Sequence, residues 1–185
     1  MKPAKYLRAI ALLSLCVAMA LSLCGCGNSG AKKKITSDVT ERLEAIVAGD
    51  YSSLAYLAAG LEAEDLAEYG VEESELLAAF LEEFAYEVGS ISVSGSTATV
   101  SVVLTCKSYL EFYRAFEEAV YDIPLDNSDA TESELAELFE EAIYDAIAEA
   151  DTTQVTVVLT YEKIDKTWSP TSDYEQLLAN ALLAG

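Results

Sequence analysis

The chain has 185 residues, of which 32 are acidic and 11 basic, with no histidine and a formal net charge of −21. A chain this acidic is unsuited to nucleic acid, whose binding depends on lysine and arginine neutralising phosphates. The lack of histidine excludes histidine-based acid–base catalysis, the usual catalytic triads and histidine-ligated metal sites. No motif indicates a cofactor or a metal, and we expect neither.

The first 25 residues have the composition of an export signal. Lys2, Lys5 and Arg8 precede an apolar run over residues 9–23, and no acidic residue occurs before Asp38. This run is shorter than the roughly 20 residues that a bilayer-spanning helix needs. A basic start, a short apolar stretch and small residues at its end are typical of a cleavable signal peptide. An uncleaved anchor helix is the alternative, and the short length of the run argues against it.

The signal ends in Leu23-Cys24-Gly25-Cys26, which resembles the lipobox of bacterial lipoproteins. In that motif a small residue directly precedes the cysteine that carries the lipid. Gly25 precedes Cys26, whereas bulky Leu23 precedes the competing Cys24, so we predict a signal peptide over residues 1–25 and lipidation of Cys26. The resemblance implies a diacylglycerol with acyl chains of the palmitate kind, and two chains give stable attachment. The chain would then be anchored to the cell membrane on its extracytoplasmic face.

Cleavage would leave 160 residues with a net charge of −24, because the removed segment carries three basic residues and no acid. Residues 26–35 are small or charged and are predicted to form a tether, and residues 36–185 are predicted to form one domain. The lysines at 32–34 could face an anionic leaflet, where each gains about 1 kcal/mol, or could be a charged spacer. Both interpretations stay open.

Helical periodicity dominates the first part of the domain. An apolar stripe of helical spacing begins near Ser37 and ends at Gly49-Asp50,. Short helices are predicted over residues 51–59 and 62–69, and a longer helix over 72–86.

The apolar period changes to two at Val88, which predicts a β-hairpin with Gly95-Ser96 as its turn. Alternate residues of its second strand are apolar, and most of the others carry hydroxyls. This alternation is typical of a sheet that helices cover on one face only.

Two helices are predicted next, over residues 108–122 and 131–150, and Thr131 and Glu134 form a capping-box pattern before the second. A second β-hairpin over 155–168, with Asp165-Lys166 as its turn, and a last helix over 173–183 follow. The helix is preceded by a capping-box pattern at Ser172 and Glu175. This order predicts an α+β fold. We expect a curved antiparallel sheet of three to four strands, packed against N-terminal, inserted and C-terminal helices.

Four segments, at residues 43–51, 84–88, 95–102 and 161–168, resemble small bacterial lipoproteins with a nuclear-transport-factor-two-like (cystatin-like) domain. The first resembles the family's helix, Gly-Asp and short helix, and the others resemble its hairpins. The resemblance implies a curved sheet that helices wrap into a cone, sometimes with a pocket. The helical pair over residues 108–150 is an addition to the simplest form of that fold.

An aromatic stripe at Tyr109, Phe112, Tyr113 and Phe116 is the main candidate for a ligand pocket. Aromatic residues at helical spacing also occur in ordinary cores, so the stripe has two interpretations. No catalytic residue is predicted, because in so acidic a chain carboxylate pairs such as Glu140 and Glu141 arise without a catalytic role.

Cys106 continues the apolar face of a predicted strand, which favours a buried, inert thiol over a reactive one. Residues 126–129 offer several oxygen ligands, but the sixth position counted from Asp126 is Thr131. A calcium loop of the EF-hand type needs glycine there. We therefore predict a helix-capping linker at this place.

The sequence thus predicts a membrane-tethered, non-enzymatic binding or interaction domain. Its partner could be an envelope protein or a small apolar ligand, and its oligomeric state stays open. The alternative is an enzyme of the cone-shaped class that uses carboxylate or tyrosine chemistry in an apolar pocket. A cavity with converging polar groups would favour ligand binding or catalysis, and a filled core with an exposed apolar patch would favour protein contact.

Overall fold

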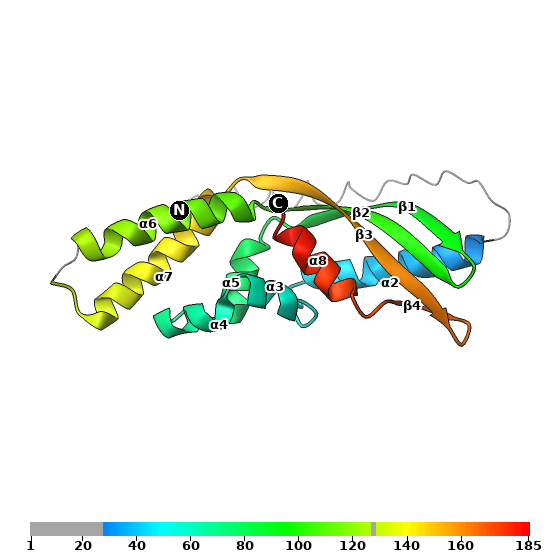
Figure 1. Ribbon diagram of the computed structural model, residues 1–185, viewed down its shortest axis with the longest axis horizontal. Coiled ribbons are helices and arrows are strands. Elements are labelled where there is room, and N and C mark those ends of the chain that lie inside the picture. The colour runs from blue at the N-terminus through cyan, green and yellow to red at the C-terminus, as the bar shows by residue number, and fades with distance from the viewer. Residues whose placement is uncertain (1–27, 127–128) are drawn as a thin grey trace, which may run out of the picture.

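A four-stranded antiparallel sheet forms the centre of the computed structural model, which describes residues 28–126 and 129–185. The strands lie side by side in chain order: β1 (Ala85–Ser94), β2 (Thr97–Lys107), β3 (Thr152–Ile164) and β4 (Thr167–Pro170). This arrangement confirms the predicted α+β class and the curved antiparallel sheet (Figure 1). The predicted signal peptide over residues 1–25, Cys26, and two residues of the predicted linker, Asn127 and Ser128, lie outside the described residues.

The two turns of the sheet lie where the sequence predicts them. Gly95, between β1 and β2, has a φ of 61°, which glycine adopts without steric cost,. Between β3 and β4, Asp165 and Lys166 both have positive φ, at 49° and 71°. Two consecutive positive φ values match the twist that a tight hairpin needs.

One face of the sheet is buried and the other is open. Val100, Val102 and Leu104 of β2 and Leu159 and Tyr161 of β3 are fully buried. α2 (Ser29–Val47) and α8 (Tyr174–Leu182) lie on this side of the sheet (Figure 1). The opposite face of these strands carries mainly threonine and serine, as the alternation in the sequence predicts. We call β1–β4 with α2 and α8 the sheet body.

α2 begins at Ser29, earlier than the predicted start near Ser37, so residues 29–35 of the predicted tether are helical. The helix extends because Ile35 is fully buried and adds one turn to the apolar stripe of Val39 and Leu43. Lysine is also a good helix former, so the run at 32–34 continues the helix. At the start of α2, the Asn28 side-chain nitrogen donates to the Val93 carbonyl oxygen at 3.3 Å.

Short helices connect α2 to the sheet: α3 (Ala55–Gly60), α4 (Ala63–Leu66), the 3-10 helix η1 (Ala67–Tyr69) and α5 (Glu73–Phe80). The helix predicted to run to residue 86 ends at Phe80, and β1 begins at Ala85, before the predicted Val88. Tyr86 and Val88 explain the earlier start, because they are half-buried at the strand period and pair with Leu104 and Val102.

The two predicted capping boxes have different outcomes. Thr131 and Glu134 form theirs, since each side chain accepts a hydrogen bond from the backbone N–H of the other residue. The Ser172 and Glu175 prediction is wrong, because α8 starts after Asp173 without a side-chain cap. Instead, the Thr171 hydroxyl donates to an Asp173 carboxylate oxygen at 2.5 Å.

The inserted helices α6 (Tyr109–Asp126) and α7 (Glu132–Glu149) form an antiparallel pair that projects from one end of the sheet (Figure 1). Ile143, Ala146 and Ile147 of α7 are buried near the sheet end of the pair. Tyr69 of η1 contacts Phe139 of α7, with ring centroids 4.9 Å apart. Within residues 28–126 and 129–185, no helix has the length and apolar character needed to cross a membrane.

Candidate functional site

The four aromatic residues predicted to line a pocket form a row along α6. Phe112 is buried and meets Phe80 edge-on, with ring centroids 6.2 Å apart. Tyr109 and Phe116 are half-buried and contact Phe112, whereas Tyr113 is 43% exposed. None of the four lines either of the two hollows described below. The row attaches α6 to the core, and its use as a ligand pocket stays a prediction.

Cys106 is fully buried, as predicted from its place on the apolar face of β2. Its Sγ lies 3.9 Å from the Leu182 carbonyl oxygen. Burial raises the pKa of the thiol to about 11, so the reactive thiolate is scarce near neutral pH,. This environment is that of an inert core cysteine.

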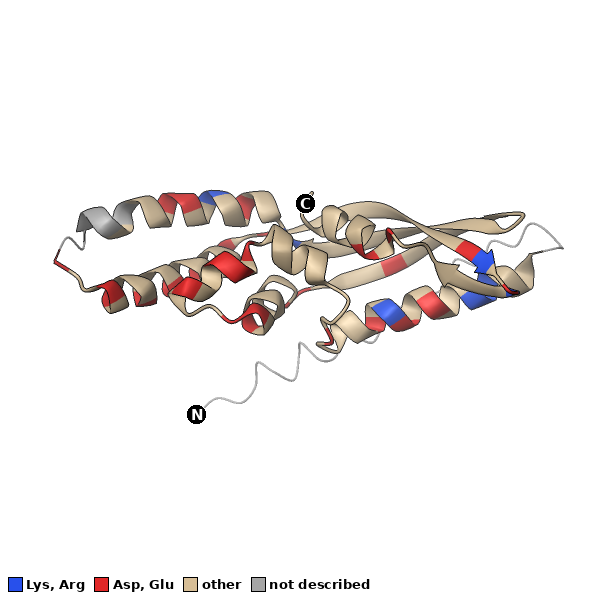
Figure 2. Ribbon diagram, turned by 60° about the horizontal axis from the view of Figure 1, so that its bottom comes forward, with Lys and Arg blue, Asp and Glu red and all other residues tan. Residues whose placement is uncertain are grey.

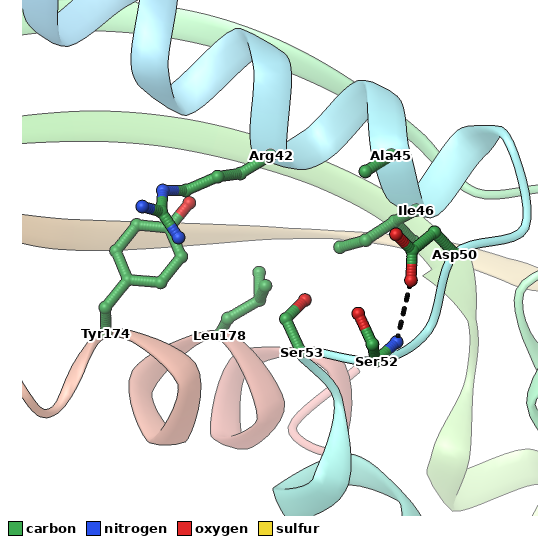
Figure 3. A pocket seen from close by; sticks show the side chains of 8 residues that line it. All are labelled: Arg42, Ala45, Ile46, Asp50, Ser52, Ser53, Tyr174 and Leu178. Carbon is green, nitrogen blue, oxygen red and sulfur yellow. Dashed lines mark hydrogen bonds between the residues drawn. The ribbon is translucent and has the colours of Figure 1, made fainter.

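A small hollow of about 170 Å³ lies between α2, the segment after it, and α8 (Figure 3). We call it the Arg42 hollow, and it is lined by Arg42, Ala45, Ile46, Asp50, Ser52, Ser53, Tyr174 and Leu178. A basic and an acidic residue therefore share a space that is otherwise bounded by hydroxyls and apolar side chains.

Arg42 is held in place by two contacts, one of which Tyr161 supports through Asp38. Its Nε donates to an Asp38 carboxylate oxygen at 2.9 Å, and the Tyr161 hydroxyl donates to the same oxygen at 2.8 Å. The guanidinium carbon lies 5.6 Å from the centroid of the Tyr174 ring, within the range of a cation–π contact,. Because Tyr161 is in the sheet and Tyr174 in α8, these contacts join α2 to both.

The charge states in the Arg42 hollow follow from its contacts. Burial acts to lower the pKa of Arg42, but the hydrogen bond and charge of Asp38 outweigh it, so the pKa is raised. Hydrogen bonds from Ser52 lower the pKa of Asp50, whose carboxylate accepts from the Ser52 backbone N–H at 3.1 Å. Burial raises the pKa of Tyr174 to about 12, and that of Tyr161 also rises. Near neutral pH the hollow is therefore lined by one cation, Arg42, one anion, Asp50, and the neutral Tyr174.

A second hollow of about 300 Å³ runs between α6 and α7. We call it the alanine groove, and it is lined by Ala115, Ala119, Ile123, Leu138, Glu141, Ala142, Asp145, Ala146 and Glu149. Its three acids are spaced four residues apart on α7, so they lie on one side of that helix. Acidic residues also continue along the helices around it, while most of the sheet is free of charge (Figure 2).

The sequence predicts neither hollow, for different reasons. Arg42 contacts Tyr174, and Asp50 shares a hollow with them, only because α8 folds back against α2, and no spacing in the sequence encodes that arrangement. Ala115, Ala119, Ala142 and Ala146 do recur at a spacing of four residues, which is a local signal for a close helix pair,. In the described part of the chain, no three acidic or cysteine residues come together as a metal site.

No known family model matches the chain, and no curated protein is significantly similar to it in sequence. The structure is similar to the crystal structure of a candidate lipoprotein, ycdA, from Bacillus subtilis, with 17% identity and a TM-score of 0.43. The match covers 67% of this chain and 44% of that protein, so the chain spans less than half of its length. A likeness this weak carries no argument about family, and the nuclear-transport-factor-two-like relationship stays a prediction.

Proposed function

We propose that the chain is a membrane-anchored extracytoplasmic lipoprotein whose domain binds another protein through the α6–α7 pair and catalyses no reaction. The observation that carries the binding role is the alanine groove, an apolar floor beside an acidic ridge on helices that project from the sheet body. The anchoring role rests on the export signal and on the lipobox-like sequence at residues 23–26.

The α6–α7 pair offers exposed apolar side chains at which a partner could bind. The largest side chains between the sheet and its helices, such as Phe80 and Tyr161, are fully buried and leave a filled core. Large apolar side chains on α6 remain outside, with Leu110 52% exposed and Tyr121 74% exposed. Exposed apolar surface with a polar border is characteristic of protein contact sites.

The occupant that fits the alanine groove is a cationic amphipathic helix. Alanines at Ala115, Ala119 and Ala142 leave space for another helix to approach closely, as in helix-in-groove recognition,. Lysine or arginine on the flank of that helix would meet Glu141 and Asp145. The excess of acidic residues would also speed its approach, since opposite charge steers association.

The place where α2 begins, relative to the α6–α7 pair, also supports this function. α2 begins only three residues after Cys26 and has 19 residues, so it extends about 28 Å,. Its first turn lies at the end of the sheet opposite to the α6–α7 pair (Figure 1). An anchor at Cys26 would therefore hold that end near the membrane and leave the alanine groove at the far end, open to a partner.

The anchoring role can be tested by mass spectrometry of the mature N-terminus. We expect a chain that begins at Cys26 and carries a diacylglycerol, and we expect Cys26→Ser to block both lipid attachment and signal cleavage. Cys24→Ser is the matched control and should leave processing unchanged. A mature chain that begins elsewhere, or lacks lipid, would contradict the anchoring role.

The binding role can be tested with a designed cationic peptide of alanine, leucine and lysine, about 18 residues or five helical turns long. Charge reversal in the groove, by Glu141→Lys, Asp145→Lys and Glu149→Lys together, should weaken binding about tenfold or more, roughly 1.4 kcal/mol. The control reverses the exposed residues Glu64, Asp65 and Glu68 to lysine and makes the same change in net charge. Equal losses in both variants would show non-specific attraction and contradict a site in the groove, as would no binding of the peptide to the unchanged chain.

A further inference from the structure

The Arg42 guanidinium has donors to spare in a space that is open to a small molecule. Its one hydrogen bond to a described residue is made by Nε, to Asp38, which leaves both Nη groups without a protein partner in the described structure. Asp38 accepts from Nε, and the guanidinium lies over the Tyr174 ring (Figure 3), so these two contacts orient its Nη donors. A fixed, planar pair of N–H donors is the geometry that binds a carboxylate through two hydrogen bonds.

Asp50 supplies the opposite charge on the other side of the Arg42 hollow (Figure 3). Its position is fixed by the hydrogen bond from the Ser52 backbone N–H. The Ser52 and Ser53 side chains lie next to it on the edge of the hollow, where their hydroxyls can donate or accept,. A ligand ammonium could therefore be held by a carboxylate and two hydroxyls.

Size and surroundings restrict the ligand further. A volume of about 170 Å³ is below the roughly 300–1,000 Å³ of pockets for drug-sized molecules, so only a small molecule fits,. Ala45, Ile46 and Leu178 give the hollow an apolar side that suits a short aliphatic group. The buried Tyr174 hydroxyl has no hydrogen-bond partner in the described structure and lies on the Arg42 side (Figure 3).

Net charge decides between a simple anion and a zwitterion. The chain as a whole repels anions, and Asp50 would repel an anion within the hollow itself. A simple cation would meet Asp50 but would leave both Arg42 Nη groups without an acceptor. A molecule with one charge of each sign, and no net charge, meets an opposite charge on each side and is not repelled by the acidic surface.

We propose that the Arg42 hollow binds a small zwitterion of the α-amino-acid class, with its carboxylate on the Arg42 Nη groups and its ammonium on Asp50. Ala45, Ile46 and Leu178 then contact a short side chain. This site lies in the sheet body and is independent of the protein-binding role of the α6–α7 pair.

The test is calorimetric titration of the mature lipidated protein in detergent with glycine, L-alanine and L-serine as probes. We expect saturable binding with a dissociation constant of about 1 mM or tighter. Acetate and ethylamine, which each carry one of the two charges, should bind at least about tenfold more weakly at the same ionic strength. Saturable binding of acetate as strong as that of L-alanine would overturn the zwitterion assignment, as would no binding of the three amino acids.

Two variants locate the binding without depending on a single mutation. Asp50→Asn should weaken L-alanine binding at least about tenfold, because it removes the charge that meets the ammonium. Ala45→Leu fills the hollow and leaves both charges in place, so it should also abolish binding. Ala48→Leu is the matched control on the exposed end of α2, outside the lining, and should bind as the unchanged protein does. Unchanged binding by the Ala45→Leu variant, with its circular dichroism intact, would place the ligand elsewhere and contradict the proposal.

Discussion

The sheet body and the α6–α7 pair differ in how their side chains are buried. In the sheet body, most inward residues of β2 and β3 are buried between the strands and α2 or α8. Among the described side chains of α6 and α7, most apolar residues are only half-buried, and a few, such as Phe112 and Ile143, are buried. The sheet body can therefore fold around its own core, whereas the α6–α7 pair keeps apolar surface available to a partner.

This difference shows that acidic charge has different consequences in the two regions. On α2, Asp38 is engaged by Arg42 and Tyr161, so that carboxylate helps hold the sheet body together. On α7, Glu141, Asp145 and Glu149 are exposed and line a groove that no basic residue shares. We infer that the charge of the first region is structural and that of the second serves recognition.

The largest expected effect comes from leucine deletion in the two regions. Leu159→Ala removes a fully buried side chain from β3 and should lower the free energy of unfolding by about 2–5 kcal/mol,. Leu138→Ala in the alanine groove should lower the free energy of unfolding by about 1 kcal/mol, because the half-buried Leu138 removes less apolar surface from water on folding,. Urea denaturation measures both. Equal losses would show that the two regions are packed alike and would contradict the comparison.

The next largest effect is expected in the reaction rate of a thiol, which should be slow in the sheet body and rapid in the α6–α7 pair. With a pKa of about 11, native Cys106 should react roughly 100-fold more slowly near pH 8 than in the unfolded chain, and burial should slow it further,. The measurement uses the mature lipidated chain, in which the Cys26 sulfur carries the lipid and Cys106 is the one free thiol. An Ala119→Cys variant that also lacks Cys106 carries its thiol in the groove and should react rapidly. Similar rates at the two positions would contradict the difference in burial.

The same thiol gives stability a dependence on pH. Its pKa is raised in the folded state, so the folded chain holds the proton more tightly than the unfolded chain does,. The stabilisation is complete below about pH 9, the ordinary thiol value, and is lost as the pH rises toward about 11,. We expect Cys106→Ala to flatten this part of the stability profile. A profile that keeps the same slope in the variant would assign the alkaline loss to other groups.

The smallest effect concerns the start of α7. Thr131→Ala breaks the capping box with Glu134 and should cost about 1 kcal/mol, seen as faster hydrogen exchange in the first turns of α7,. Thr36→Ala is the control, because that exposed hydroxyl only donates back to the Lys32 carbonyl of its own helix. A cost for Thr36→Ala as large as that for Thr131→Ala would mean that the cap contributes little.

The sequence predicts those features that are encoded locally. The alternation in β2, the glycine turn at Gly95 and the capping box at Thr131 each depend on neighbouring residues, and each is present in the structure. The start of α2 was misplaced because three lysines look like a solvated tether, although the buried Ile35 follows them directly. The residues from Ser172 to Glu175 have the spacing of a capping box, but no such box forms. Thr171 instead hydrogen-bonds to Asp173 before the start of α8.

Features that depend on distant segments could not be predicted in the same way. The Arg42 hollow requires α8 to lie against α2, which places Tyr174 beside a residue far away in the sequence. Likewise, the sequence predicts the aromatic stripe on α6, but it does not predict that Phe112 of this stripe contacts Phe80, on a helix before the sheet. Helical spacing shows that such residues share a face and does not show what that face meets.

The most direct test of the central claim, that the α6–α7 pair is the protein-binding region, is hydrogen exchange with and without the designed cationic peptide. We predict that the peptide slows exchange in α6 and α7 and leaves the rates of β2 and β3 unchanged. The charge-reversed groove variant should lose this protection, and the variant reversed at Glu64, Asp65 and Glu68 should keep it. Protection that falls on the sheet body, or that spreads evenly over the acidic surface, would contradict the claim.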